Sequence, residues 1–222
     1  MTRWTVVVVA LITGILVSSG CIGTPSTPTS TNNTNSETPK SGVTLPKTLS
    51  FTSVLTITRG NATLMNYSYS AIIDYSKMNA QVNFTSVSRP GMQGLTGNWH
   101  HKRIIIENGS SVRMFVAPPA AWMPVPENQT EEIIESVFHS NPYVIIFNST
   151  SKSINCSECS LNVTLSPEVS ALLLAQFVGA NNAPNIPMEG VIVVKDSVIV
   201  SANFTGVFED KTYSFSLEVK DA

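Results

Sequence analysis

Alternation of apolar and polar residues dominates the chain from about Leu45 onward. Phe51, Leu55 and Ile57 alternate with Thr52 and other hydroxyl residues. Neighbouring side chains of a strand point to opposite faces, so a period of two predicts a sheet with one buried face. The chain from residue 45 to its end is therefore expected to build its core on one side of a β-sheet.

Further segments show the same period or end at turn signals. Asn108-Gly109 is the strongest hairpin signal, because both residues tolerate the positive φ of a type I′ turn. Local pairing of this kind predicts two antiparallel meanders. The strands are expected at 51–58, 65–73, 78–84, 99–107, 111–116, 188–194, 197–208 and 212–219.

Two helices are expected between the meanders. For the first, Asn128 is the expected cap, with Glu131 as its capping-box partner, followed by an apolar stripe. For the second, Ser166 is the cap, Pro167 occupies the first turn and Gly179 ends the helix. Strands, then helices, then strands predict an α+β fold with helices on one face of an antiparallel sheet.

The N-terminus predicts export. Arg3 precedes an apolar run of 14 residues that is too short to span a bilayer comfortably, and Ser18-Ser19-Gly20 leads to Cys21. This pattern resembles a lipobox, and with Ser18 three positions before the cysteine it resembles euryarchaeal surface lipoproteins more than bacterial ones. The resemblance implies a signal peptide at 1–20 and a lipid on Cys21. The alternative is an ordinary signal, or an anchor with an incidental cysteine.

A polar stretch follows. Thr24 to Gly42 holds ten Ser/Thr, three Pro and three Asn in 19 residues, which cannot form a core. Residues 21–44 are therefore expected to be the lipidated cysteine and a stalk, glycosylated or plain, with a single domain at 45–222. Its expected location is the outer face of the cytoplasmic membrane.

Composition leaves a solubility question. Only 13% of the 222 residues are charged, with a net charge of −2. The absence of a basic excess argues against nucleic-acid binding. Ten of the 18 asparagines lie in Asn-x-Ser/Thr, although the Ser/Thr content predicts about four by chance. Glycans at these sites would keep the surface soluble in place of charged side chains. The alternative is that the high Ser, Thr and Asn content creates the sequons by composition alone. The candidate sites are Asn32, Asn61, Asn66, Asn83, Asn108, Asn128, Asn148, Asn155, Asn162 and Asn203.

The remaining chemistry is sparse. Cys156 and Cys159 are predicted to form a structural disulfide, with redox activity or a metal site as alternatives. His100 and His101 would point to opposite faces of a strand and cannot readily share a metal. No nucleophile–base constellation, metal motif or cofactor motif is recognisable, so we expect no enzyme, no metal and no cofactor.

The element order resembles the LolA/LolB-like lipoprotein-carrier superfamily. The segments that carry this resemblance are 104–109, 121–126 and 189–196. It implies a curved half-barrel sheet with two or three helices across its concave face, and a cavity for a lipid or another apolar ligand. The helix at 172–177 is the expected lid. Candidate ligand contacts are Phe51, Met65, Tyr67, Tyr69, Phe84, Trp122, Phe138, Leu173 and Phe177.

Two functions remain open at this point. One is a membrane-tethered carrier or receptor for an apolar ligand. The other is a non-catalytic envelope or interaction lipoprotein with a filled core and no ligand. Composition does not separate them, because core and cavity use the same residue types.

Overall fold

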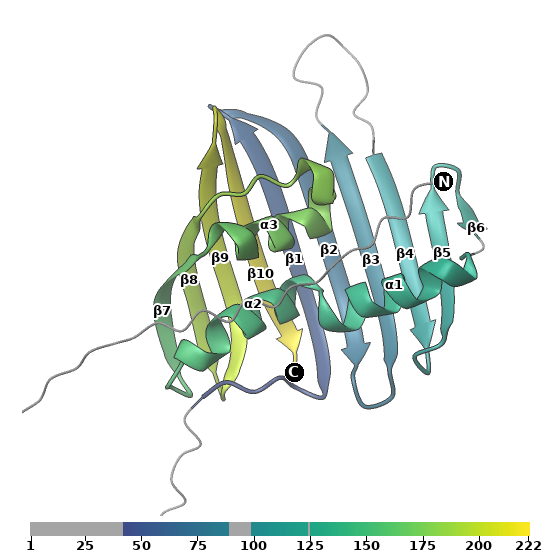
Figure 1. Ribbon diagram of the computed structural model, residues 1–222, viewed down its shortest axis with the longest axis horizontal. Coiled ribbons are helices and arrows are strands. Elements are labelled where there is room, and N and C mark those ends of the chain that lie inside the picture. Colours follow the sequence, from purple (N-terminus) through teal and green to yellow (C-terminus); the bar gives the residue numbers. More distant parts are fainter. Residues whose placement is uncertain (1–41, 89–98, 124) are drawn as a thin grey trace, which may run out of the picture. The chain divides into compact units, whose positions relative to one another are not determined.

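A computed structural model describes residues 42–88, 99–123 and 125–222 (Figure 1). The expected signal peptide, Cys21, Asn32 and nearly all of the expected stalk lie outside the described residues. In the described part, no helix is long and apolar enough to cross a membrane.

One antiparallel sheet organises the described residues. Its order is β6-β5-β4-β3-β2-β1-β10-β9-β8-β7, so it is open, with β6 and β7 at its edges. The ten strands found in this part of the chain are β1 (Thr48–Arg59), β2 (Ala62–Asp74), β3 (Asn79–Ser88), β4 (Trp99–Glu107), β5 (Ser111–Ala117), β6 (Ala121–Met123), β7 (Cys159–Leu165), β8 (Met188–Lys195), β9 (Val198–Phe208) and β10 (Lys211–Asp221).

The two predicted meanders are joined into this single sheet by β1 and β10. These strands pair antiparallel from Phe51 opposite Val219 to Thr58 opposite Thr212. Asn108 and Gly109 have φ values of 53° and 63°, which confirms the predicted hairpin turn between β4 and β5. The antiparallel α+β class is therefore confirmed.

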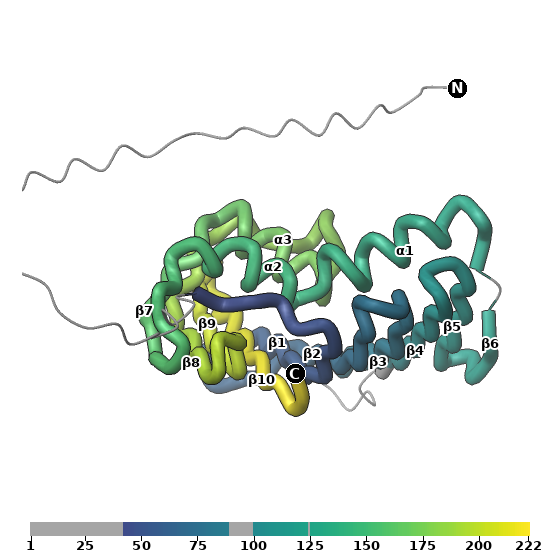
Figure 2. The backbone as a smooth tube through the Cα atoms, turned by 90° about the horizontal axis from the view of Figure 1, so that it is seen from below, coloured from purple at the N-terminus to yellow at the C-terminus, as the bar shows by residue number. Residues whose placement is uncertain are grey.

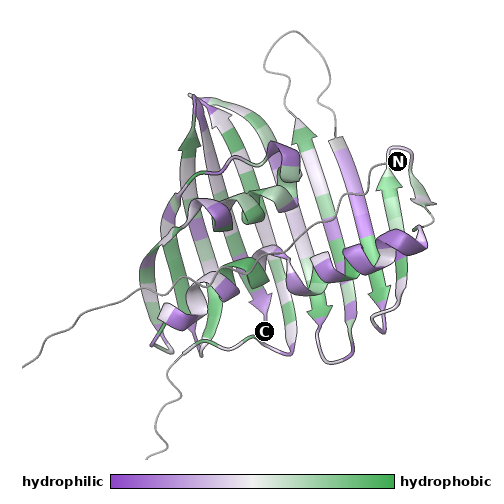
Figure 3. Ribbon diagram, in the orientation of Figure 1, coloured by the Kyte–Doolittle hydropathy of each residue, from purple (hydrophilic) through white to green (hydrophobic). Residues whose placement is uncertain are grey.

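Three α-helices lie on one face of the sheet, which we call the covered face (Figure 2). They are α1 (Glu127–His139), α2 (Pro142–Thr150) and α3 (Pro167–Val178). Helix α1 runs across β3, β4 and β5, whereas α2 and α3 lie over the half of the sheet around β1, β10 and β9 (Figure 1). Figure 3 shows that α1 carries many hydrophilic residues, and its glutamates Glu131, Glu132 and Glu135 are exposed.

The period of two decides which strand residues are buried. Along β1, Leu49, Phe51, Ser53, Leu55 and Ile57 are buried and the residues between them are only partly so. The second face, which we call the open face, carries mainly Ser, Thr and Asn side chains without a helix layer. This arrangement matches the polar, Thr-rich surface expected from the sequence.

One of the two predicted helix starts is confirmed and the other is wrong. Ser166 caps α3 by accepting a hydrogen bond from the Val169 amide at 3.4 Å, and Gly179 follows its last residue, as predicted. The prediction for Asn128 was wrong. Helix α1 begins at Glu127 with Pro126 in the cap position, so Asn128 already lies in its first turn and makes no cap.

Asn141 joins α1 to α2 and is fully buried. Its side-chain oxygen accepts from the Val144 amide at 3.1 Å, which caps α2. Its amide nitrogen donates to the Val137 carbonyl at 2.8 Å and to the Tyr75 hydroxyl at 3.2 Å. One side chain thus satisfies partners on two helices and on the segment after β2.

We expect Asn141→Ala to lower the free energy of unfolding by about 2 kcal/mol, because a cap is lost and buried polar groups lose their partner. Urea denaturation measures this change. Asn182→Ala is the matched control, because the exposed Asn182 donates to the Val178 carbonyl at 3.0 Å. It should cost under about 0.5 kcal/mol. Equal losses in the two variants would show that Asn141 is not a structural junction.

Candidate binding cleft

Helix α1 is held to the sheet mainly by its C-terminal end. Val137 and Phe138 are buried, whereas Ile133 and Ile134 of the same apolar stripe are only partly buried. A helix that is buried at one end leaves room beneath the other. The stripe itself was predicted correctly.

Two adjoining cavities fill this room. The first, of about 420 Å³, lies between α1 and strands β4 and β5. The second, of about 260 Å³, extends between the ends of α1 and α3 over β2, β3 and β4. They share four lining residues, so we treat them as one site, the helix cleft; the shared residues are Lys102, Ile104, Ser136 and Val137.

The smaller cavity of the helix cleft is mainly apolar, whereas half of the residues that line the larger cavity are polar. Tyr69, Val82 and Phe84 come from the sheet, and Phe177 and Ala175 come from α3. The Phe177 ring lies 6.5 Å from the rings of both Tyr69 and Phe84. Burial raises the pKa of Tyr69, so its hydroxyl stays neutral and acts as a polar but uncharged group.

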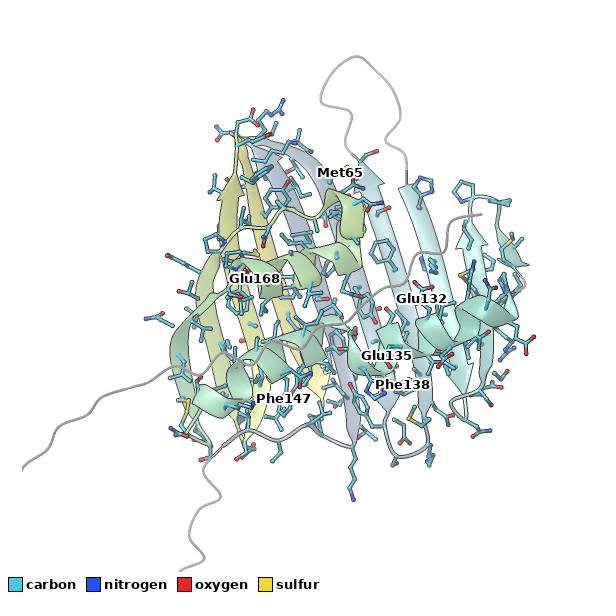
Figure 4. All side chains as sticks on the ribbon, viewed as in Figure 1. Met65, Glu132, Glu135, Phe138, Phe147 and Glu168 are labelled. Atoms are coloured by element: carbon cyan, nitrogen blue, oxygen red, sulfur yellow. A yellow bond between two sulfur atoms is a disulfide. The ribbon has the colours of Figure 1, made fainter. Side chains whose placement is uncertain are left out.

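Polar groups lie where α1 and α3 approach each other. The Ser136 hydroxyl of α1 donates to the Gln176 side-chain oxygen of α3 at 3.4 Å. Glu132 and Gln129 of α1 line the larger cavity together with Met114 of β5. Figure 4 labels Glu132 on α1. The smaller cavity therefore has mainly apolar walls, and the two helices add polar side chains to both cavities.

The ammonium group of Lys102 adds a positive charge to the walls of both cavities. Lys102 belongs to β4, opposite Phe84 of β3 and Val116 of β5, and its side chain is half-buried. Desolvation lowers the pKa of Lys102, because a low-dielectric surrounding disfavours the ammonium form.

The predicted ligand contacts divide into three groups. Tyr69, Phe84 and Phe177 line the helix cleft. Phe51, Tyr67, Phe138 and Leu173 are buried in the core without lining it, and Met65 packs against that core. Leu173 and Leu174 of α3 pack into the core, whereas the end of the same helix lines the smaller cavity of the cleft. The role of α3 as a lid stays a prediction.

Trp122 lies elsewhere, at the β6 edge of the sheet, and 51% of it is exposed. It contacts the Phe115 ring at 5.7 Å, and the Arg113 guanidinium lies 5.8 Å from its ring centre. Trp122 and Arg113 line a separate groove of about 350 Å³ rather than the helix cleft.

Cys156, Cys159 and the histidines are not among the residues that line the helix cleft. The sulfurs of Cys156 and Cys159 are bonded beside the start of β7, as predicted. His100 is exposed, and His101 contacts Thr85 through a 3.2 Å hydrogen bond. Within residues 42–88, 99–123 and 125–222, no three side chains of the metal-binding types come together.

The sequon asparagines differ in solvent exposure from Asn141, which is fully buried and not part of a sequon. Asn83 is half-buried, and the others in the described part are exposed: Asn61, Asn66, Asn108, Asn128, Asn148, Asn155, Asn162 and Asn203. By strand alternation, Asn66, Asn83, Asn162 and Asn203 lie on the open face.

The sequence reasoning missed Lys102 and the other polar residues of the cleft, which are Gln129, Glu132, Ser136 and Gln176. The strand neighbours of Lys102, Ile104 and Ile106, are buried on the same face, and this period of two was the available signal for it. A scan against protein-family models and a search of curated proteins found no match to this chain. The site is therefore interpreted from its own geometry.

Proposed function

We propose that this protein is a membrane-anchored, glycosylated surface lipoprotein whose helix cleft binds or carries an apolar ligand such as a lipid. The observation that carries the proposal is the helix cleft itself, with cavities of about 420 and 260 Å³ and an interior of Tyr69, Phe84 and Phe177. Small-molecule sites typically have volumes of about 300–1,000 Å³ and mostly apolar walls.

The resemblance to LolA/LolB-like carriers supports the same proposal. An open antiparallel sheet covered on one face by three helices agrees with the expected half-barrel arrangement in strand pairing and in the placement of the helices. In such an arrangement, a ligand enters between the sheet and its helices. Here, the partly buried end of α1 leaves that space accessible.

The ligand is tested on the full chain carrying Cys21→Ser, so that no covalent lipid confuses the result. The purified protein is extracted with organic solvent, and the extract is examined by mass spectrometry. A lipid present at about one molecule per protein supports the proposal. A lipid-free protein that also takes up no added amphiphile would favour the alternative, an envelope lipoprotein with a filled core.

The membrane anchor has a separate test. We propose that Cys21 carries the lipid, so wild-type protein should sediment with membranes and the Cys21→Ser variant should be released. Intact-mass measurement of the same samples reports the lipid and the glycans. The exposure of most sequon asparagines supports glycosylation, because the transferring enzyme needs access to the side chain.

The disulfide should matter for stability but not for binding. Its loop of four residues lies outside the helix cleft, and loop-closure entropy predicts a loss of about 2 kcal/mol for Cys156→Ala with Cys159→Ala. Denaturation with and without reductant checks this value, because reduction should destabilise only the wild type. Lost ligand uptake in a folded double variant would contradict the structural role.

A further inference from the structure

Lys102 is a lysine in a setting that lysines usually avoid. It lines both cavities of the helix cleft, and in the smaller one it is the sole charged residue among the described lining residues. Ile104, Val137 and Phe177 surround the same space. Even a half-buried ammonium loses part of its hydration, and an anion that pairs with it offsets this loss.

Among the described residues, no carboxylate forms an ion pair with Lys102. The ion pairs found in this part of the chain join Arg59 to Asp210, Lys77 to Asp74 and Arg113 to Glu107, and none includes Lys102. Glu132 of α1 lines the larger cavity but is not paired with the ammonium. Helix α3 contributes the neutral Gln176, and the cross-strand neighbours are Phe84 and Val116.

We infer that the helix cleft selects single-chain amphiphiles with an anionic head, which Lys102 binds while the hydrocarbon chain lies against Ile104, Val137 and Phe177. This inference rests on the proposed function and narrows its ligand class. The pairing restores a partner to the desolvated ammonium. Ser136 and Gln176 add polar groups beside it, and their mutual 3.4 Å hydrogen bond is long enough to be exchanged for bonds to a head group.

The cavity volumes favour one chain over two. Taken as one site, the two adjoining spaces of about 420 and 260 Å³ stay within the range of about 300–1,000 Å³ for small-molecule sites, which suits a ligand with one hydrocarbon chain. Carboxylate and phosphate heads present the same negative oxygens to a lysine. We therefore infer only that the head group is negatively charged, and the experiment distinguishes a carboxylate from a phosphate.

The test measures binding by titration calorimetry with the full-length Cys21→Ser chain, freed of lipid. The probes are dodecanoate, dodecyl phosphate, dodecanol and dodecyltrimethylammonium, each below its micelle concentration. We expect dodecanoate, dodecyl phosphate or both to bind about ten- to hundredfold more tightly than dodecanol, as charged hydrogen bonds predict. Which anion binds more tightly identifies the head group.

Lys102→Met should remove this preference and leave dodecanol binding unchanged. Lys195→Met is the matched control, because Lys195 is exposed at the end of β8 and should leave every affinity unaltered. Lys102→Arg keeps the charge and should keep the preference. It also keeps the test decisive if Lys102→Met fails to fold, which its melting temperature reports.

The outcomes separate the two proposals. Equal binding of anion and alcohol, tighter binding of the cationic probe, or an anion preference that survives Lys102→Met would overturn the inference while the apolar-ligand proposal stands. Failure to bind any of the four probes would count against both.

Discussion

Leu174→Ala is expected to lower the free energy of unfolding by about 2–5 kcal/mol, the range observed when a buried leucine is truncated. Leu174 is 0% exposed and belongs to the face of α3 that packs onto the sheet. Its truncation removes buried methyl groups and leaves a cavity that the surrounding side chains fill only in part.

Leu172 provides a control within the same helix. It is 60% exposed, so Leu172→Ala should change stability by no more than about 0.5 kcal/mol. Urea denaturation of both variants, with unchanged slopes, measures the difference. A similar loss for both would show that the outer face of α3 is covered in solution, and negligible losses for both would mean that α3 does not pack as described.

The elements that the sequence predicted well depend on local signals. Asn108 and Gly109 themselves favour the positive φ angles that the turn requires. Ser166 and Pro167 likewise favour a helix start through their own side chains. The alternation of apolar and polar residues also predicted strands correctly, because one face of each strand is buried. These features need no knowledge of distant partners.

Helix α2 was missed for a physical reason. Its first residues, Pro142 to Phe147, form a nearly continuous apolar run without helical periodicity, and α2 is largely buried. Asn141 as cap and Pro142 in the first turn were available signals. Strand β7 at the sheet edge was also missed, although its exposed residues alternate with half-buried ones and this alternation was an available signal.

The candidate site was predicted only in part. Tyr69 and Phe177 belong to the helix cleft, whereas Phe51 and Leu173 fill the core. These side chains have the same chemistry, and what separates them is how far α1 stands from β4. That spacing depends on packing between elements far apart in the sequence. Lys102 was overlooked because its significance comes from the burial of its surroundings.

Gly190→Ala is expected to cost about 3 kcal/mol or more, at the upper end of what overpacking causes, because its new methyl group would meet a neighbouring backbone. Gly190 of β8 pairs with Phe204 of β9. A Cβ atom at this position would collide with the Asn203 carbonyl oxygen and lie 2.7 Å from Cδ1 of Phe204. Strand backbones cannot yield as a flexible side chain can, so β8 would have to separate from β9.

Gly60→Ala is the control for introducing a methyl group at a glycine. Gly60 has no atom within 4 Å of its would-be Cβ, but its φ of +55° should cost about 1 kcal/mol. Denaturation curves compare the two variants, and hydrogen exchange locates the damage. We expect amide protection to fall in β7, β8 and β9 of Gly190→Ala while β2 to β5 keep theirs. A stability loss no larger than that of Gly60→Ala would contradict the close packing of β8 against β9.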